Sequence, residues 1–273
     1  MKKVSIKIGS ILAFVLFFAN GCTTNEGSDF STKSQKVFSE NTANREKSDG
    51  PENPANPQDV VGQQHNTVVS SVMINANNLE TIDDYINFSR QEALRQYNYS
   101  SNSPTNEQIK TVIYDVRNNF KNVISNSNFS EESKFQLERF VAIMTDSKFD
   151  NDYNALKSEI VNFENDLLRN VLIPSVEKDK LLQVTSIGRY SSFYWFNLML
   201  EIKNENSAES NVLARRRWWK WALIGVCDAL GAIGGAIAGT PTGIAAVGMA
   251  VVGGAGASGG AATVLDYLTS DNP

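Results

Sequence analysis

The sequence predicts an all-α protein: a disordered tether, a bundle of about six helices, and a Gly/Ala-rich helical hairpin. Apolar residues recur at helical spacing from residue 59 to residue 204. No stretch alternates apolar and polar residues between turn signals, as a half-buried strand would. From Trp221 to Leu265 the chain is almost entirely Gly, Ala, Val, Ile and Leu. These three observations define the fold class.

Residues 1–22 have the composition of a segment that is removed during export. Lys2 and Lys3 form a positive start, and Ile8–Phe18 is an apolar run too short for a comfortable spanning helix. Gly21 then precedes Cys22. This order resembles the bacterial lipoprotein signal, which implies that Cys22 is acylated, for example with palmitate, and becomes the mature N-terminus. The alternatives are an ordinary secretory signal with a chance cysteine, or an uncleaved anchor.

Residues 23–58 are rich in Ser, Thr, Asn, Glu, Lys and Pro, with Pro51, Pro54 and Pro57 near the end. A segment with so few apolar side chains cannot bury enough surface to offset its ordering entropy. We therefore expect a solvated tether between the anchor and the folded domain.

The helical domain is predicted to span residues 59–204. Thr105, Ser130 and Asp152 are in position to cap helix N-termini, and Pro174 separates the last two helices. The expected helices cover residues 60–73, 79–97, 105–124, 130–144, 152–173 and 175–203, and a polar linker, 205–214, follows. Six helices of this size can bury a substantial core.

Residues 215–268 form the predicted hairpin, in which Thr240–Gly243 separates two apolar pieces of roughly 20 residues, long enough to cross a bilayer. Small residues recur at every fourth position, which lets two helices pack closely. The packing residues are Gly231, Gly235, Gly239, Ala250, Gly254 and Ser258. A membrane-interface anchor is expected at Arg215, Arg216, Arg217, Trp218, Trp219 and Trp221.

The insertion energy of the first hairpin helix is close to zero. Its Leu, Ile and Val side chains contribute about −3 kcal/mol, and Asp228 near the bilayer centre costs roughly +3 kcal/mol. Insertion therefore requires close helix packing or an interfacial position for Asp228, with Lys220 two turns earlier as a possible partner. The alternative is a hairpin buried inside a water-soluble helical domain.

Few residues suggest chemistry. Cys227 is expected to be a small apolar side chain, and the single histidine, His65, has no cysteine or carboxylate cluster near it in the sequence. The run Tyr190–Phe196 contains several aromatic residues that are expected in the core or against the hairpin, or else in a ligand groove. We expect no enzyme activity, no cofactor and no metal. The net charge of −5, without a basic stripe outside Arg215–Lys220, argues against nucleic acid.

Two further resemblances bear on function. Gly62-Gln63-Gln64-His65-Asn66 resembles the Gly-x-x-His-Asn opening of uncharacterised Bacteroidota lipoproteins. The Gly-rich C-terminus resembles the glycine-zipper hairpins of envelope proteins and the Gly-rich helices of some bacteriocins. Together they imply a lipoprotein of the bacterial cell envelope, at the outer membrane, whose hairpin inserts in or docks on a membrane. The hairpin could also bind a protein partner or a second copy. The alternative is a periplasmic or surface binding module with a buried hairpin.

Overall fold

The computed structural model describes residues 50–75, 78–79, 81–97, 106–107, 110, 121–122, 124–149, 152–205 and 228–229. Within these ranges the protein is all-α, as the sequence predicts, and contains no strand. The predicted sites at Cys22 and in the hairpin beyond Ala229, and those in the basic aromatic stretch before it, lie outside the described residues.

Five α-helices and one short 3-10 helix make up the described part of the domain. They are α3 (Asp59–Ile74), α4 (Ile82–Tyr97), α6 (Glu131–Met144), η2 (Ser147–Phe149), α7 (Tyr153–Arg169) and α8 (Ser175–Glu205). Each α-helix coincides with a predicted one, and the largest difference is at the end of α7, which is expected from the sequence to continue to the stop before Pro174 and ends at Arg169. The predicted helix 105–124 lies mostly outside the described residues, although its described positions 106–107, 110, 121–122 and 124 are helical.

Two predicted capping residues occupy N-cap positions. The Ser130 side chain accepts a hydrogen bond from the Ser133 backbone N–H at 3.3 Å, and the Asp152 side chain accepts one from the Ala155 N–H at 2.9 Å. Each satisfies a backbone donor that has no partner within its helix. Local sequence is therefore sufficient to determine where α6 and α7 begin.

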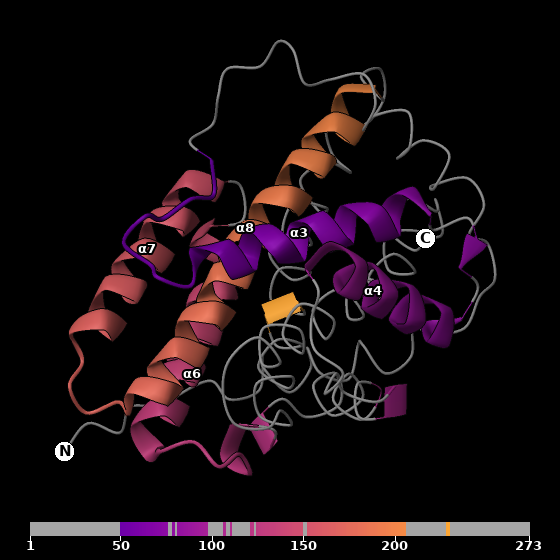
Figure 1. Cartoon of the computed structure of the whole chain (residues 1–273). Coiled ribbons are helices and arrows are strands. Elements are labelled where there is room, and N and C mark those ends of the chain that lie inside the picture. Colours follow the sequence, from indigo (N-terminus) through magenta and orange to yellow (C-terminus); the bar gives the residue numbers. More distant parts are fainter. Residues whose placement is uncertain are drawn as a thin grey trace.

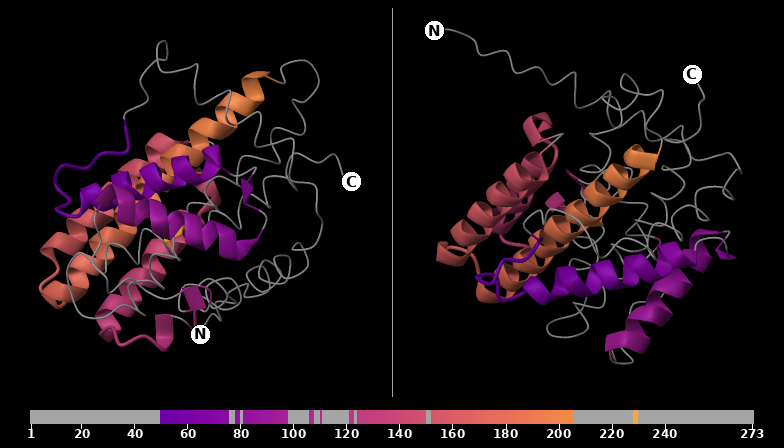
Figure 2. Two further views of the ribbon diagram at one scale, coloured as in Figure 1. Left: turned by 45° about the vertical axis from the view of Figure 1, so that its right-hand side comes forward. Right: turned by 90° about the horizontal axis from the view of Figure 1, so that it is seen from above.

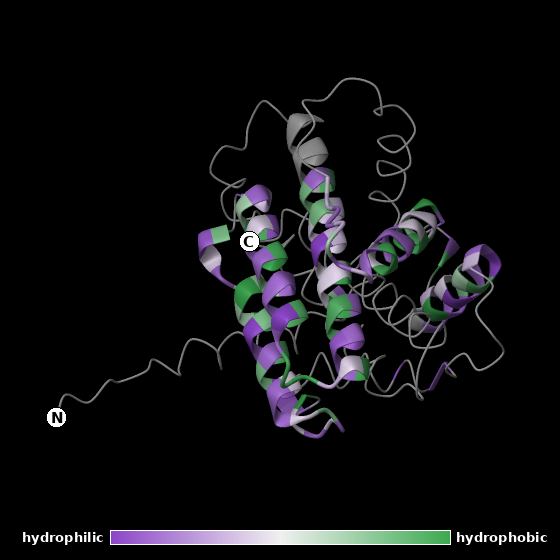
Figure 3. Ribbon diagram, turned by 60° about the vertical axis from the view of Figure 1, so that its left-hand side comes forward, coloured by the Kyte–Doolittle hydropathy of each residue, from purple (hydrophilic) through white to green (hydrophobic). Residues whose placement is uncertain are grey.

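Helix α8 is the central element of the domain (Figure 1). Every residue from 181 to 192 is buried, on all sides of the helix. Helix α7 runs alongside α8, while α3 crosses it and continues into α4 (Figure 2). Helix α6 packs against both α7 and α8. Figure 3 shows apolar and polar positions alternating along the helices, as expected for amphipathic elements around a shared core.

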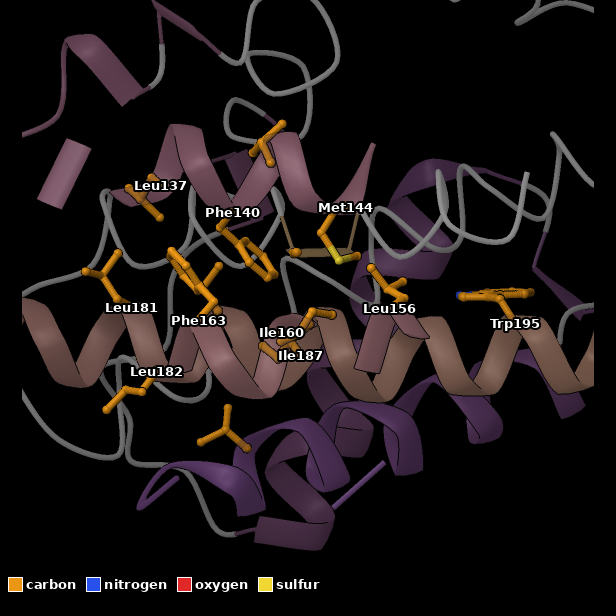
Figure 4. Close-up of a cluster of buried hydrophobic side chains, with 14 of the residues drawn as sticks. Leu137, Phe140, Met144, Leu156, Ile160, Phe163, Leu181, Leu182, Ile187 and Trp195 are labelled. Atoms are coloured by element: carbon orange, nitrogen blue, oxygen red, sulfur yellow. The ribbon is translucent and has the colours of Figure 1, made fainter. Parts of the chain in front are cut away.

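The apolar core lies around α8 and is lined by α6 and α7 on one side and by α3 and α4 on the other; Figure 4 shows the part between α6, α7 and α8. Phe140 of α6 stacks on Phe163 of α7 with ring centroids 5.8 Å apart. The other buried side chains of this region include Leu137, Met144, Leu156, Ile160, Leu181 and Ile187. None of the described helices is long and apolar enough to cross a membrane.

The end of the predicted tether is packed on the domain, which differs from the sequence-based expectation. Pro51, Asn53 and Asn56 are buried, and the Lys157 ammonium group donates a hydrogen bond to the Gly50 carbonyl. The polar composition of residues 50–58 suggested a solvated chain. These amide side chains are nevertheless buried, because they donate hydrogen bonds to a carboxylate in the core.

Helix α3 approaches α8 most closely at Gly62. The Gly62 backbone N–H donates to Ser186 Oγ at 3.0 Å, and the same hydroxyl donates to the Asp59 carbonyl at 2.9 Å. A Cβ on Gly62 would lie 2.5 Å from Ser186 Oγ and 2.6 Å from the Ser186 carbonyl oxygen. The second contact is with backbone and cannot be relieved by turning a side chain. Glycine is therefore required by the crossing of the two helices.

We predict that Gly62→Ala destabilises the domain by about 1–3 kcal/mol, because α3 must move away from α8. In an exposed helix position the same change would stabilise the protein by about 1 kcal/mol, so the sign of the effect is diagnostic. Denaturant unfolding measures it, with exposed Gln63→Ala as the control. A stabilising Gly62→Ala would contradict the close crossing.

Candidate functional site

Helix α8 buries an unusual number of polar side chains, and these form two clusters. The buried polar residues of α8 are Gln183, Thr185, Ser186, Arg189, Ser191 and Ser192. We define the Arg189 cluster as Arg189 with Asp59, Glu164 and their hydrogen-bond partners. We define the Asp228 cluster as Asp228 with Ser191, Trp195 and His65. A buried polar group destabilises the folded protein unless it has hydrogen-bond or ion-pair partners.

Arg189 is fully buried and contacts two carboxylates from different helices. Its Nη2 lies 2.5 Å from Asp59 Oδ1 of α3 and 3.3 Å from Glu164 Oε1 of α7. Tyr190 donates its hydroxyl to Asp59 Oδ2 at 2.9 Å, and its ring centroid lies 5.4 Å from the Arg189 guanidinium carbon. Arg189 Nε and Nη1 have no hydrogen-bond partner within the described part of the chain. The two carboxylates and the Tyr190 ring therefore provide the interactions that stabilise the buried guanidinium charge.

Glu164 is the most heavily hydrogen-bonded residue of this cluster. Its carboxylate accepts from Asn53 Nδ2 at 2.6 Å, Asn56 Nδ2 at 2.8 Å and Thr185 Oγ1 at 2.9 Å. With the Arg189 contact, both oxygens have partners although the side chain is fully buried. These hydrogen bonds replace those to water that the carboxylate loses on burial.

The electrostatics of the Arg189 cluster favour a structural role. Burial tends to lower the pKa of Arg189, but Glu164 and Asp59 more than offset this effect and the net shift is upward. Burial, followed by the hydrogen bond to Asp59, raises the pKa of Tyr190. Both side chains thus keep their protons at neutral pH. Neither is adjusted toward the intermediate pKa that proton transfer requires.

The Asp228 cluster lies on another side of α8. Asp228 is fully buried, and its Oδ2 accepts hydrogen bonds from Ser191 Oγ at 2.5 Å and from Trp195 Nε1 at 3.2 Å. The neighbouring residue, Ala229, belongs to the apolar core; its Cβ would lie 3.4 Å from a Cβ added at Gly188 of α8. Residues 228–229, at the beginning of the Gly-rich stretch, are therefore part of the helical domain.

His65 of α3 completes this cluster. Its Nε2 lies 3.8 Å from Asp228 Oδ2, and its Nδ1 lies 3.2 Å from Asn66 Oδ1. The Asn66 amide nitrogen donates to the Tyr190 carbonyl, which leaves Asn66 Oδ1 available to accept from the ring. Burial lowers the pKa of His65, and the opposing effects of Asp228 and Asn66 do not overcome it. The fold therefore favours the neutral imidazole.

These contacts differ from those of a serine–histidine catalytic pair. The Ser191 hydroxyl donates its hydrogen bond to the buried Asp228 carboxylate, and His65 Nε2 lies 3.8 Å from the same carboxylate oxygen. No group of three or more potential metal ligands occurs among the described residues. The described contacts of this cluster join α3, α8 and residues 228–229.

Some of the residues predicted from the sequence lie in the Asp228 cluster, and others lie outside the described residues. His65 lies beside Asp228, a juxtaposition that the sequence did not indicate. Trp195, from the aromatic run, is fully buried and donates to Asp228. Phe193, Tyr194 and Phe196 pack against the apolar core, in line with the core interpretation of that run. Lys220, the partner considered for Asp228, lies outside the described residues, and the described hydrogen-bond donors come from α8 instead.

Sequence reasoning missed Asp59, Glu164 and Arg189. One available signal was the position of Glu164, four residues after Ile160 on the apolar stripe of α7. A carboxylate on a buried stripe needs a buried partner. The identity of that partner could not be derived from spacing, because Arg189 belongs to another helix.

Comparison with protein-family models, curated proteins and solved structures finds no match for this chain.

We predict that Glu164→Ala destabilises the protein by about 3–5 kcal/mol, because it leaves the buried Arg189 without one of its counter-ions. The control is Asp166→Ala on the same helix. Asp166 pairs with Arg169 at 2.8 Å, but both side chains are exposed, so the expected cost is below about 1 kcal/mol. Denaturant unfolding of the two variants compares the pairs directly. Similar losses for both would contradict the structural role of the Arg189 cluster.

His65 should make the protein sensitive to mild acid. Its pKa is lower in the folded protein than the ordinary value of 6.5, so the unfolded chain binds more protons below that pH. The stabilising effect of keeping His65 neutral is thus complete above pH 6.5 and is lost as the pH falls. The slope for one proton is at most about 1.4 kcal/mol per pH unit.

The measurement is the free energy of unfolding from pH 7.5 to 5.5 for the native protein and for His65→Gln. The variant should lose less stability across this range, even if it is less stable at neutral pH. Parallel curves for the two proteins would show that His65 does not carry the effect.

Proposed function

We propose that this protein is a lipid-anchored, non-enzymatic binding module of the bacterial envelope, whose helical domain holds the beginning of its Gly-rich hairpin. The observation that carries the proposal is the burial of Asp228 against Ser191 and Trp195 of α8. It favours the second of the two functions considered from the sequence, in which the hairpin is a packed element of the protein.

The energetics of Asp228 support this choice. In a spanning helix that begins at Trp221, Asp228 would lie about 10 Å below the start of the helix, at a cost approaching 3 kcal/mol. In the domain, the same carboxylate accepts two hydrogen bonds from α8. Ala229 adds apolar burial beside it. The first hairpin helix is therefore better accommodated by protein at this position than by lipid.

The envelope location depends on the N-terminal sequence. The positive start, the apolar run and the small residue before Cys22 support acylation at that cysteine, and the polar residues 23–49 support a tether. The hairpin residues after Ala229 carry the small-residue stripe at Gly231, Gly235 and Gly239. That stripe supports close packing with another helix, from this chain, a second copy or a partner protein.

The anchor and the docking of Asp228 are tested in one set of variants. Cys22→Ala should abolish incorporation of labelled palmitate and release the protein from carbonate-washed membranes. In that background, Asp228→Leu should leave the protein in the soluble fraction and destabilise it by about 2 kcal/mol or more, because the Ser191 and Trp195 donors lose their acceptor.

The matched control is Asp166→Leu, which adds the same side chain at an exposed position. It should change neither membrane retention nor stability appreciably. If Asp228→Leu instead binds the membrane more tightly, without loss of folding, the hairpin lies in lipid and the proposal fails. Undiminished palmitate label on Cys22→Ala would contradict the anchor.

A further inference from the structure

The turn between α7 and α8 presents two adjacent aliphatic side chains to solvent. Val171 is 89% exposed and Leu172 is 73% exposed. Val176, in the first turn of α8, is 48% exposed. Tight turns usually carry Gly, Asn, Asp or Ser, which tolerate both the backbone geometry and the solvent. Neighbouring exposed aliphatic residues in such a turn indicate an interaction surface.

The exposure of this turn is fixed by its neighbours. The Asn170 side chain accepts from the Leu172 backbone N–H at 2.9 Å, and its amide donates to Glu132 Oε1 of α6 at 2.7 Å. Ile173 is buried in the core. The backbone is held on both sides of Leu172, so Val171 and Leu172 are directed outward by the fold.

Charged side chains of both signs lie next to the turn, and they include exposed Asp179 in α8. Glu177 is directed back toward α6, where it accepts from Ser130 Oγ at 2.7 Å and from the Ser130 backbone N–H at 3.0 Å. Arg169 pairs with exposed Asp166, and such surface pairs are weak enough to be exchanged for a phosphate. Lys178 lies on the other side of the turn, with its ammonium group 3.2 Å from the Leu168 carbonyl. Arg169 and Lys178 are thus the cations beside the aliphatic tip, in positions where they can contact the phosphate groups of a phospholipid surface.

The tether allows this turn to reach the anchoring membrane. Gly50 is held by Lys157 in the second turn of α7, whereas the turn follows the other end of that 17-residue helix, about 25 Å long. The covalent length of residues 23–49 allows a separation of at most roughly 90 Å between their ends. The anchored domain can therefore turn its α7–α8 end toward the bilayer.

We propose that Val171, Leu172 and Val176, flanked by Arg169 and Lys178, form a contact site for the phospholipid surface to which the chain is anchored. This inference rests on the proposed lipid anchor. Three aliphatic side chains bind a membrane weakly from free solution, but a tether keeps the turn at a high effective concentration near the bilayer. The acyl chain and the turn would then supply the two signals that stable membrane association needs.

A matched pair of probes tests the contact. Val176→Cys and Val60→Cys replace the same residue type at similar exposure, 48% and 52%, on different elements. Both proteins also carry Cys227→Ala, so that the introduced cysteine is the residue labelled with an environment-sensitive fluorophore. The acylated, labelled proteins are reconstituted in vesicles of phosphatidylethanolamine and phosphatidylglycerol. These vesicles contain nitroxide-labelled phosphatidylcholine, which quenches a fluorophore that reaches the lipid. We expect loss of fluorescence at residue 176 and none at residue 60. Leu172→Asp should abolish the loss at residue 176.

Equal quenching at residues 176 and 60, or quenching at residue 176 that persists with Leu172→Asp, would overturn the proposed contact. Leu172 is exposed, so the aspartate is compatible with the fold, and circular dichroism verifies this. The mass of the N-terminal peptide reports acylation in the same preparation. An unacylated N-terminal peptide would contradict the proposed anchor. In that case, quenching at residues 176 and 60, measured at excess lipid, still decides whether the turn contacts the vesicle.

Discussion

The buried guanidinium group of Arg189 is the constraint on which the arrangement of the domain depends. A charge removed from water must find opposite charges and hydrogen bonds nearby, and Arg189 takes them from Asp59 of α3 and Glu164 of α7. Glu164 in turn binds Asn53 and Asn56, which holds the segment before α3 on the core. One buried cation thus connects the N-terminal segment and α3 to α7 through the central helix.

The Asp228 cluster applies the same requirement to the C-terminal part of the chain. An apolar Gly-rich segment by itself has no preferred partner, because lipid, protein core and another helix can all accept it. A carboxylate within the segment restricts this choice, since it needs hydrogen-bond donors. Ser191 and Trp195 supply them, with His65 of α3 beside them. The beginning of the hairpin is consequently bound to the element that organises the rest of the domain.

These contacts suggest how the chain is arranged in the envelope under the proposed function. The polar tether reaches the domain near Lys157, at one end of α7, and the exposed aliphatic turn lies at the other end. Buried and partly buried ion pairs and hydrogen bonds join the segments inside the bundle.

The sequence by itself determined the helices of this protein and several of their ends. Apolar spacing, Ser130 and Asp152 as caps and the break at Pro174 act over a few residues, so they can be recognised without knowing the fold. Only the tertiary structure decided that Asn53 and Asn56 belong to the core, that Gly62 is the point of contact between α3 and α8, and that Asp228 lies against α8. The reason is physical: a buried polar group is stable only beside its partner. Glu164 is 111 residues from Asn53, a pairing that helix packing creates and local spacing cannot encode.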